Sequence, residues 1–290
     1  MIDNNIMAVP QQQSLPQIVT LAEIEEIVSS PKFATNLIEA IKQGFVSYSN
    51  DEFNACPIQT MGALPMKAFG DNANNNSNYS AQTCVKSGYV SKASHYVIKV
   101  ASGGHPFPNN SGNIQLYSQQ TGKLETILMD EGILTEIRTA ACGAVAAELL
   151  SPKLTKDSAF IGILGTGVQA RYQLQYLKHI TDCRNVLVWG RTERNVIQLI
   201  KDMKSEGWNI KAVDDPNKLL DLCSLIVTTT CSREPVLGKG YNTQLLSKKP
   251  LHISAIGSDA TGKVELTNEV SSIKYVYMYH DRNRSLSNRS

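Results

Sequence analysis

The stretch Ala159–Ala170, AFIGILGTGVQA, joins a run of apolar residues to a glycine-rich turn. Ala159–Leu164 has the length and composition of a buried strand. Directly after it comes Gly165-Thr166-Gly167-Val168-Gln169-Ala170, with the spacing Gly-x-Gly-x-x-Ala. In such turns the first glycine permits a tight bend, the second lets the backbone approach a pyrophosphate, and the small third residue lets helix and strand pack closely. The N-terminus of the following helix attracts phosphate. Residues 165–170 therefore predict dinucleotide binding, the alternative being a glycine turn without a ligand.

Further apolar runs follow this turn and alternate at first with helical segments. Strands are expected at 186–189, 210–213, 224–228 and 251–256, and helices at 168–180, 193–206 and 216–223. Short apolar strands that alternate with helices are typical of a parallel sheet covered on both faces. Residues 153–279 are therefore predicted to form a Rossmann-type, doubly wound α/β domain, with the boundary near Ser151–Ser158.

The first half of the chain has a different pattern, in which two helices precede several strands. A capping box at Thr20–Glu23 predicts a helix through Val28, and a second helix is expected to start at Ser30-Pro31. Strands are expected at 95–101, 114–119 and 124–129, with a hairpin at Thr121-Gly122, a helix at 136–150 and an Asn-rich surface loop at 71–80. Residues 1–152 are therefore predicted to form an α+β domain.

Composition excludes several classes of protein. The 290 residues include 28 Lys and Arg and 26 Asp and Glu, and the net charge of +2 gives no general attraction for nucleic acid or membrane surfaces. No apolar run is long enough to span a membrane, and the N-terminal sequence is unlike a signal peptide, so a cytoplasmic protein is expected. The six cysteines and five histidines form no closely spaced pairs, so no metal site is predicted.

The end of the second strand of the predicted Rossmann domain indicates which dinucleotide binds. An NAD site usually has an acidic residue there to bond the ribose 2′-hydroxyl, whereas this chain has Gly190-Arg191-Thr192. Because a guanidinium suits a 2′-phosphate, Arg191 and Thr192 predict NADP, with NAD as the alternative cofactor and a solvated Arg191 as the alternative role. Thr228, Thr229 and Thr230 end a later strand and are expected to line the dinucleotide, unless they only complete the core.

Several blocks of sequence occur in a distinctive order between about Lys86 and Leu266. They are Lys86-x-Gly88-Tyr89, Tyr96-Val97-Ile98-Lys99, Asp130-Glu131-Gly132, Thr135-x-x-Arg138-Thr139-Ala140-Ala141, the glycine turn and Gly257-Ser258-Asp259. In these blocks the chain resembles the ornithine cyclodeaminase/mu-crystallin family. The resemblance implies an NAD(P)-dependent enzyme that acts on the Cα–N bond of a small amino or imino acid. It also implies a homodimer, with the first domain serving substrate binding and dimerisation.

The same resemblance assigns roles to individual side chains. Lys99 and Arg138 become the clamp on the substrate α-carboxylate, with Lys86 as a third candidate, and Thr139 joins the cofactor-binding residues. A guanidinium and an ammonium suit a planar carboxylate, although Lys99 on a surface strand and Arg138 in an interdomain salt bridge are the alternatives. Asp259 becomes the acid/base group near the substrate nitrogen, the alternative being a turn aspartate that bonds its own backbone.

These assignments predict a ketimine reductase, in which NADPH delivers hydride to the C=N carbon of a cyclic or N-substituted imino acid. One alternative is an ornithine cyclodeaminase, which oxidises its substrate, releases ammonia and re-reduces on bound NAD. Another is a mu-crystallin-like ligand-binding protein with weak catalysis. Because chains of the family continue well past the Asp259 turn, the protein is expected to be a shortened member with low activity, and residues 280–290 a disordered tail.

Overall fold

The computed structural model describes residues 15–62, 81–104, 109–156, 159–259 and 262–272. The Asn-rich stretch 71–80 and the tail 280–290 lie outside these ranges. The chain divides into two compact units, of which the first comprises Met1–Ser29 and Val46–Gly132 and the second Ser30–Phe45 and Ile133–Ser290. This division differs from the boundary expected near Ser151–Ser158, because the helix that ends at Leu150 packs within the second unit.

The first unit is built on one seven-stranded sheet. Its elements are β1 (Gln17–Val19), α1 (Leu21–Val28), β2 (Phe53–Ala55), β3 (Gln59–Gly62), β4 (Gln82–Val90), β5 (His95–Gly104), β6 (Asn109–Ser118) and β7 (Leu124–Leu128). The strand order is β1-β7-β6-β5-β4-β2, with β3 also on β4, and only the β1–β7 pair is parallel among the strands described. The predicted hairpin joins β6 to β7, and Gly122 in its turn has a φ of 69°. An α+β unit is therefore present, as expected.

Both predicted N-terminal helices form. The capping box of α1 is complete, since the Thr20 backbone N–H donates to Glu23 Oε2 at 2.8 Å and the Glu23 N–H donates to Thr20 Oγ1 at 3.4 Å. Helix α2 (Phe33–Ser49) begins two residues later than the expected first-turn proline, because Pro31 and Lys32 form a turn in front of it.

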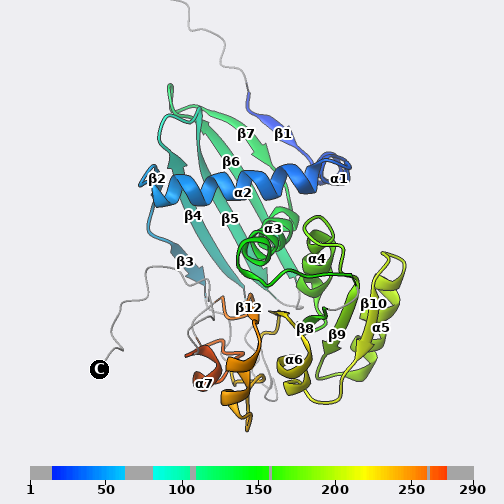
Figure 1. Ribbon diagram of the computed structural model, residues 1–290. Helices are drawn as coiled ribbons and strands as arrows, with labels where there is room; N and C mark the ends of the chain where they lie inside the picture. Colours follow the sequence, from blue (N-terminus) through cyan, green and yellow to red (C-terminus); the bar gives the residue numbers. More distant parts are fainter. Residues whose placement is uncertain (1–14, 63–80, 105–108, 157–158, 260–261, 273–290) are drawn as a thin grey trace, which may run out of the picture. The chain divides into compact units, whose positions relative to one another are not determined.

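The second unit contains a five-stranded parallel sheet (Figure 1). Its elements are α3 (Ile133–Leu150), β8 (Ile161–Leu164), α4 (Val168–Leu177), β9 (Asn185–Trp189), α5 (Glu193–Lys204), β10 (Asn209–Ala212), α6 (Asn217–Leu222), β11 (Leu225–Thr228), the 3₁₀ helix η1 (Thr243–Lys248), β12 (His252–Ala255) and α7 (Asn268–Ser271). The strand order is β10-β9-β8-β11-β12. All five predicted strands form within two residues of their expected ends, and the Rossmann-type fold is confirmed.

Helices cover both faces of this sheet and form two apolar clusters. On one face Ile161 and Ile163 of β8 pack with residues of α4 and α5, including Leu174 and Leu199. On the other face lie Leu164, together with Leu219 and Leu220 of α6, Ile226 of β11 and Ile253 of β12. Burial on both faces explains why each strand is a nearly continuous apolar run rather than an alternating one.

Small residues let α3 pack closely on α4. Ala140, Ala141 and Ala144 are fully buried, and a Cβ placed on Gly143 would lie 2.1 Å from the Oε1 atom of Gln173 on α4. Glycine at position 143 leaves room for the amide of that side chain where it lies. Contacts of α3 with α4 and β12 place it in the second unit.

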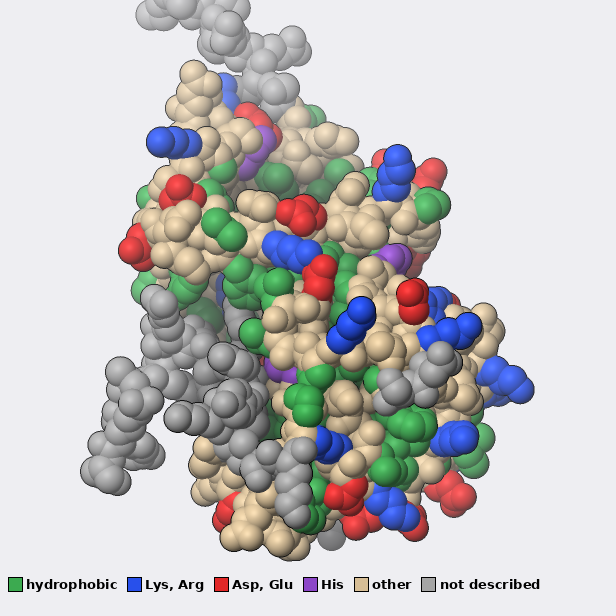
Figure 2. Space-filling view, viewed as in Figure 1, with side chains coloured by type: hydrophobic (Ala, Val, Ile, Leu, Met, Phe, Trp, Pro, Cys, Tyr) green, Lys and Arg blue, Asp and Glu red, His purple; other side chains and the backbone are tan. Residues whose placement is uncertain are grey.

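Surface charge is mixed in sign. On the face drawn in Figure 2, basic and acidic side chains are interspersed. Among the described residues, no helix is both long and apolar enough to cross a membrane.

Candidate functional site

The order of the parallel sheet reverses between β8 and β11. From β8 the chain adds β9 and then β10 on one side, and afterwards crosses over to add β11 and β12 on the other side. Ligands of open α/β sheets bind beyond the carboxyl ends of the strands at such a reversal. The candidate crevice is therefore bordered by the residues that follow β8 and those that follow β11.

The glycine turn after β8 has the geometry of a phosphate cradle. Gly165 has a φ of 115°, and a Cβ there would lie 2.7 Å from Thr229 Oγ1 and 3.0 Å from Thr229 O, so the two borders of the crevice touch at this position. At Gly167 a Cβ would meet nothing within 4 Å, so the space beside its backbone is open. Gly167 is the N-cap of α4 and supplies no side-chain cap to the amides of the first turn. An unobstructed glycine at the start of a helix whose first N–H groups have no side-chain cap fits a dinucleotide pyrophosphate.

The rest of the motif holds α4 in place. Ala170 is fully buried, whereas Val168 is 51% exposed at the start of the helix. The Nε2 atom of Gln169 donates to the backbone oxygen of Glu136 at 3.1 Å and also bonds its carboxylate. The glycine turn is thus tied to the start of α3, the helix that carries Thr139.

Thr139 itself points back along α3. Its hydroxyl donates to the Thr135 backbone oxygen at 2.7 Å, and its own backbone oxygen accepts from Gln173 Nε2 at 3.3 Å. These bonds join the Thr135–Ala141 block to α4, and cofactor binding by Thr139 stays a prediction.

Arg191 and Thr192 follow β9, next to the glycine turn. A Cβ on Gly190 would lie 2.6 Å from Thr166 Cγ2, so the glycine at position 190 permits this close approach. Arg191 and Thr192 are both exposed. Thr192 is the N-cap of α5 but makes no side-chain cap bond. Both side chains are therefore accessible at the edge of the crevice, and the choice between NADP and NAD stays a prediction.

Arg171 holds the glycine turn from behind, a role that the sequence analysis missed. Its Nη1 atom donates to the backbone oxygens of Thr166 and Gly167 at 2.8 and 3.1 Å. Its Nε and Nη2 atoms donate to Asp202 Oδ2 on α5 at 3.0 and 2.6 Å. The hydrogen bonds from Arg171 lower the pKa of Asp202. No signal in the sequence links residues 31 positions apart on two helices.

The segment after β11 is held by Glu265, a second residue that the sequence analysis missed. Glu265 is fully buried, and its Oε2 accepts from Thr228 Oγ1 at 2.6 Å. Its Oε1 accepts from the N–H and the hydroxyl of Thr230 at 2.6 and 2.8 Å. Burial raises the pKa of Glu265, and these hydrogen bonds act in the opposite direction. The Thr228 side chain is fully buried as well, so of the three predicted threonines only Thr229 and Thr230 are partly open to a ligand.

Asp259 follows β12 in an exposed turn. Its Oδ1 accepts from Lys263 Nζ at 2.7 Å, and its side chain is 64% exposed. The preceding residue, Ser258, donates from its hydroxyl to Glu265 Oε2 at 3.4 Å. The turn is thus attached to the same buried carboxylate as the end of β11, and its aspartate faces solvent.

The three predicted substrate cations lie in different units. Lys86 and Lys99 are directly opposite each other on β4 and β5, so they share one face of the first unit's sheet. Arg138 is exposed on α3 in the second unit. Burial raises the pKa of the Cys142 thiol, and Arg138, one turn away, partly offsets this rise. The clamp stays a prediction.

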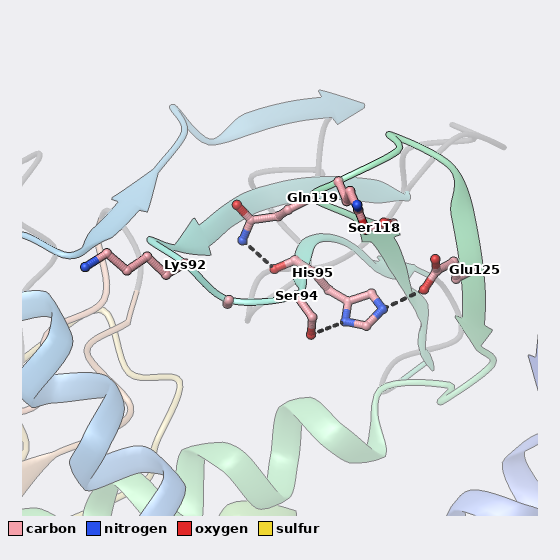
Figure 3. A pocket seen from close by; sticks show the side chains of 8 residues that line it. Lys92, Ser94, His95, Ser118, Gln119 and Glu125 are labelled. Carbon is pink, nitrogen blue, oxygen red and sulfur yellow. Dashed lines mark hydrogen bonds and ion pairs between the residues drawn. The ribbon is translucent and has the colours of Figure 1, made fainter.

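A polar hollow on the first unit is separate from these residues. Figure 3 shows His95 between Ser94 and Glu125, with Nδ1 2.8 Å from Ser94 Oγ and Nε2 2.7 Å from Glu125 Oε2. Because both ring nitrogens already have partners, the imidazole offers no ready ligand to a metal or substrate. Within the described ranges, no three His, Cys, Asp or Glu side chains come together in a way that could hold a metal ion.

Fold and glycine turn together define a Rossmann-type protein with a candidate dinucleotide site. The sequence model of the ornithine cyclodeaminase/mu-crystallin family matches residues 19–286, and the chain belongs to this family. It is 36% identical over 188 residues to an uncharacterized cyclodeaminase of Sinorhizobium fredii, covering 63% of this chain and 54% of that protein. It is 27% identical over 174 residues to ketimine reductase mu-crystallin of Macropus fuliginosus, covering 60% and 51%. The matched stretch thus spans about half the length of each relative.

Solved structures share the fold. An archaeal alanine dehydrogenase dimer with bound NAD superposes with a TM-score of 0.69 at 22% identity, covering 88% of this chain and 71% of the other. The Thermococcus litoralis Δ1-pyrroline-2-carboxylate reductase, in complex with NADH and L-proline, gives a TM-score of 0.69 at 21% identity, covering 88% and 72%. At these identities the likeness concerns the fold.

Proposed function

We propose that the protein is a ketimine reductase that uses NADP(H) to reduce the C=N bond of a small cyclic or N-substituted imino acid. The observation that carries this proposal is the open glycine cradle at the β8–β11 reversal, in a chain whose family consists of NAD(P)-dependent enzymes. The relative named ketimine reductase and the pyrroline-2-carboxylate reductase of the same fold support the choice of substrate.

Different residues of the chain have different roles in the proposed reaction. The dinucleotide, when bound, supplies the hydride that adds to the imine carbon. Residues 165–170 hold its pyrophosphate, while Lys99 and Arg138, with Lys86 as the third cation, hold the substrate α-carboxylate. Asp259 donates a proton to the imine nitrogen or keeps that nitrogen protonated, so that hydride addition gives a neutral or protonated amine. Lys263 keeps the Asp259 carboxylate in place at the crevice edge.

The cofactor preference rests on Arg191. No acidic residue occupies the end of β9, and an exposed guanidinium stands there instead. We expect NADPH to bind more tightly than NADH. The Arg191→Ala variant should have a smaller difference in affinity between the two dinucleotides. A hydrogen-bonded charge contact contributes about 1.5–3 kcal/mol, on the order of tenfold to a hundredfold in affinity. Equal affinities of the unaltered protein for NADPH and NADH would remove this part of the proposal.

A direct assay separates the proposed reaction from its alternatives. The protein is incubated with NADPH and pyrroline-2-carboxylate or piperideine-2-carboxylate, and NADPH oxidation is followed. In parallel, ammonia release from ornithine with NAD⁺ is measured. Oxidation of NADPH in the first assay supports the reductase. Ammonia release alone would assign a cyclodeaminase, and dinucleotide binding without turnover in either assay would assign a ligand-binding protein.

We also infer that the chain forms a homodimer, as the archaeal alanine dehydrogenase of the same fold does. The expected mass in sedimentation equilibrium is twice 31.8 kDa. A mass of 31.8 kDa at micromolar concentration would contradict this inference.

A further inference from the structure

The Glu265 carboxylate lies behind the second border of the dinucleotide crevice. Through Thr228 and Thr230 it is bonded to the end of β11, and through Ser258 to the turn that follows β12. Gly257 leaves room for it, since a Cβ there would lie 2.5 Å from Glu265 Oε1. One buried side chain therefore links the strand ends on which the crevice and the Asp259 turn depend.

The backbone of Glu265 is also fixed. Its carbonyl oxygen accepts from the N–H groups of Val236 and Leu237 at 2.8 and 2.9 Å, next to the bridge between Leu237 and Leu266. The side chain is therefore aimed at the strand ends from a rigid position.

The hydrogen bonds of Glu265 suit an ionised carboxylate. Its described partners are hydroxyl and backbone N–H groups, and all of them can donate to it. An ionised carboxylate is an acceptor only, and the Thr230 N–H, which can only donate, together with three hydroxyls that can donate, supplies it with four hydrogen bonds. These partners are uncharged, so hydrogen bonds rather than a cation stabilise the charge.

A buried negative charge at this position distinguishes the two forms of a nicotinamide dinucleotide. The oxidised nicotinamide ring carries a positive charge that the reduced ring lacks. In a site shielded from water, charges interact across longer distances than in bulk solvent. The positive charge also develops during hydride donation, so a group that stabilises it favours the transition state.

We propose that Glu265 is a positioning residue that joins the ends of β11 and β12 and, by its charge, favours the oxidised form of the bound dinucleotide. This proposal rests on the proposed function, because it requires the dinucleotide to bind in the β8–β11 crevice. The role differs from that of Asp259, which is exposed and already paired with Lys263.

The test measures binding without substrate. Dissociation constants for NADP⁺ and NADPH are determined separately by calorimetry with the unaltered full chain and with Glu265→Gln. The amide is a fair probe, because the hydroxyls of Thr228 and Ser258 can turn to accept from it. We expect the ratio of the NADP⁺ to the NADPH dissociation constant to rise by about three- to tenfold, the order expected for one charge in a medium of intermediate dielectric.

Two variants serve as controls. Glu269→Gln removes the same formal charge from an exposed position in α7 and should leave the ratio unchanged. Glu265→Asp keeps the charge and should hold the ratio near that of the unaltered protein, even where both affinities fall. Should Glu265→Gln not fold, the double variant Glu265→Gln, Thr228→Val is compared with Thr228→Val alone, which isolates the charge.

The outcomes separate this inference from the proposed function. A purely structural Glu265 would weaken both forms equally, and an unchanged ratio in Glu265→Gln overturns the inference while leaving the dinucleotide site intact. If the unaltered chain binds neither dinucleotide, the proposed function fails, and this inference fails with it.

Discussion

The two borders of the crevice are held by groups of different kinds. The turn after β8 is held by Arg171 and Asp202, whose side chains are 27% and 35% exposed, whereas the segment after β11 is held by the fully buried Glu265. Water screens the first pair, and the burial of Glu265 keeps its charge effective over a longer distance. We infer that the first border acts mainly through its geometry, because its charges are screened, whereas the second combines geometry with charge.

The largest expected effect concerns Asp259. It tests whether the acid/base group of the proposed reaction lies on the β11–β12 side of the crevice. Asp259→Asn keeps the shape of the side chain and removes its titratable group. Turnover should fall by about 10²–10⁴-fold, the usual contribution of a positioned acid or base, while dinucleotide affinity is retained. Steady-state kinetics and calorimetry measure the two quantities.

Lys263→Met is the matched variant for this prediction. It removes the partner of Asp259 but keeps the carboxylate, and its loss of turnover should be much smaller. Full activity of Asp259→Asn would make Asp259 a turn residue, as in the alternative interpretation of the sequence.

The next largest effect concerns Gly165. It tests whether the shape of the turn after β8 determines dinucleotide affinity. Gly165→Ala would place a methyl group 2.7 Å from Thr229 Oγ1 at a φ of 115°, which non-glycine residues avoid. The dinucleotide dissociation constant should rise on the order of 100-fold, since strain of a few kcal/mol corresponds to that factor. Gly207→Ala is the control, because it also has a positive φ but meets nothing within 4 Å. Similar affinities of both variants would show that the touching borders do not matter.

The third prediction contrasts Glu265 with a buried histidine of the five-stranded sheet. His252 on β12 is 1% exposed, and its Nε2 lies 3.0 Å from Ser254 Oγ. Its Nδ1 has no hydrogen-bond partner among the described residues. Burial lowers the pKa of His252 from 6.5 to about 4, so the folded protein keeps the ring neutral where the unfolded chain protonates it.

The sign of the pH effect follows from this lowered pKa. Above pH 6.5 the ring is neutral in both states, and between pH 6.5 and about 4 only the unfolded chain gains the proton. The free energy of unfolding should therefore fall with decreasing pH, by about 3 kcal/mol in total at 1.36 kcal/mol per pKa unit. Urea unfolding at several pH values checks this, and His252→Gln should flatten that part of the profile. Ser254→Ala keeps the imidazole and should retain the slope.

The sequence predicted those features that depend on neighbouring residues. The strands of the second unit, the capping box at Thr20–Glu23 and the glycine turn could all be predicted, because each is decided within a dozen residues. The resemblance also identified the family correctly. The place of α3 in the second unit could not be predicted, because it depends on contacts with α4 and β12, which follow later in the chain.

The supporting residues of the candidate site were missed for a similar reason. Glu265 binds Thr228 and Thr230 across 37 and 35 residues, and no local spacing marks such a contact. The burial of Thr228 could not be seen either, because a threonine at a strand end suits a core and a ligand site equally well.

The smallest expected effect sharpens the comparison between the two borders. Arg171→Met removes the bonds to the Thr166 and Gly167 carbonyls together with the pair to Asp202. Water screens the partly exposed pair, and the carbonyl bonds are partly open to water, so dinucleotide affinity should fall by about three- to tenfold. Lys178→Met is the control, because it breaks another partly exposed ion pair, with Glu206, away from the turn. Since the role of Arg171 is geometric, NADP⁺ and NADPH should weaken by the same factor, whereas Glu265→Gln should change their ratio. A change of the ratio in Arg171→Met as large as that in Glu265→Gln would show that both borders act through charge, and the distinction between them would not hold.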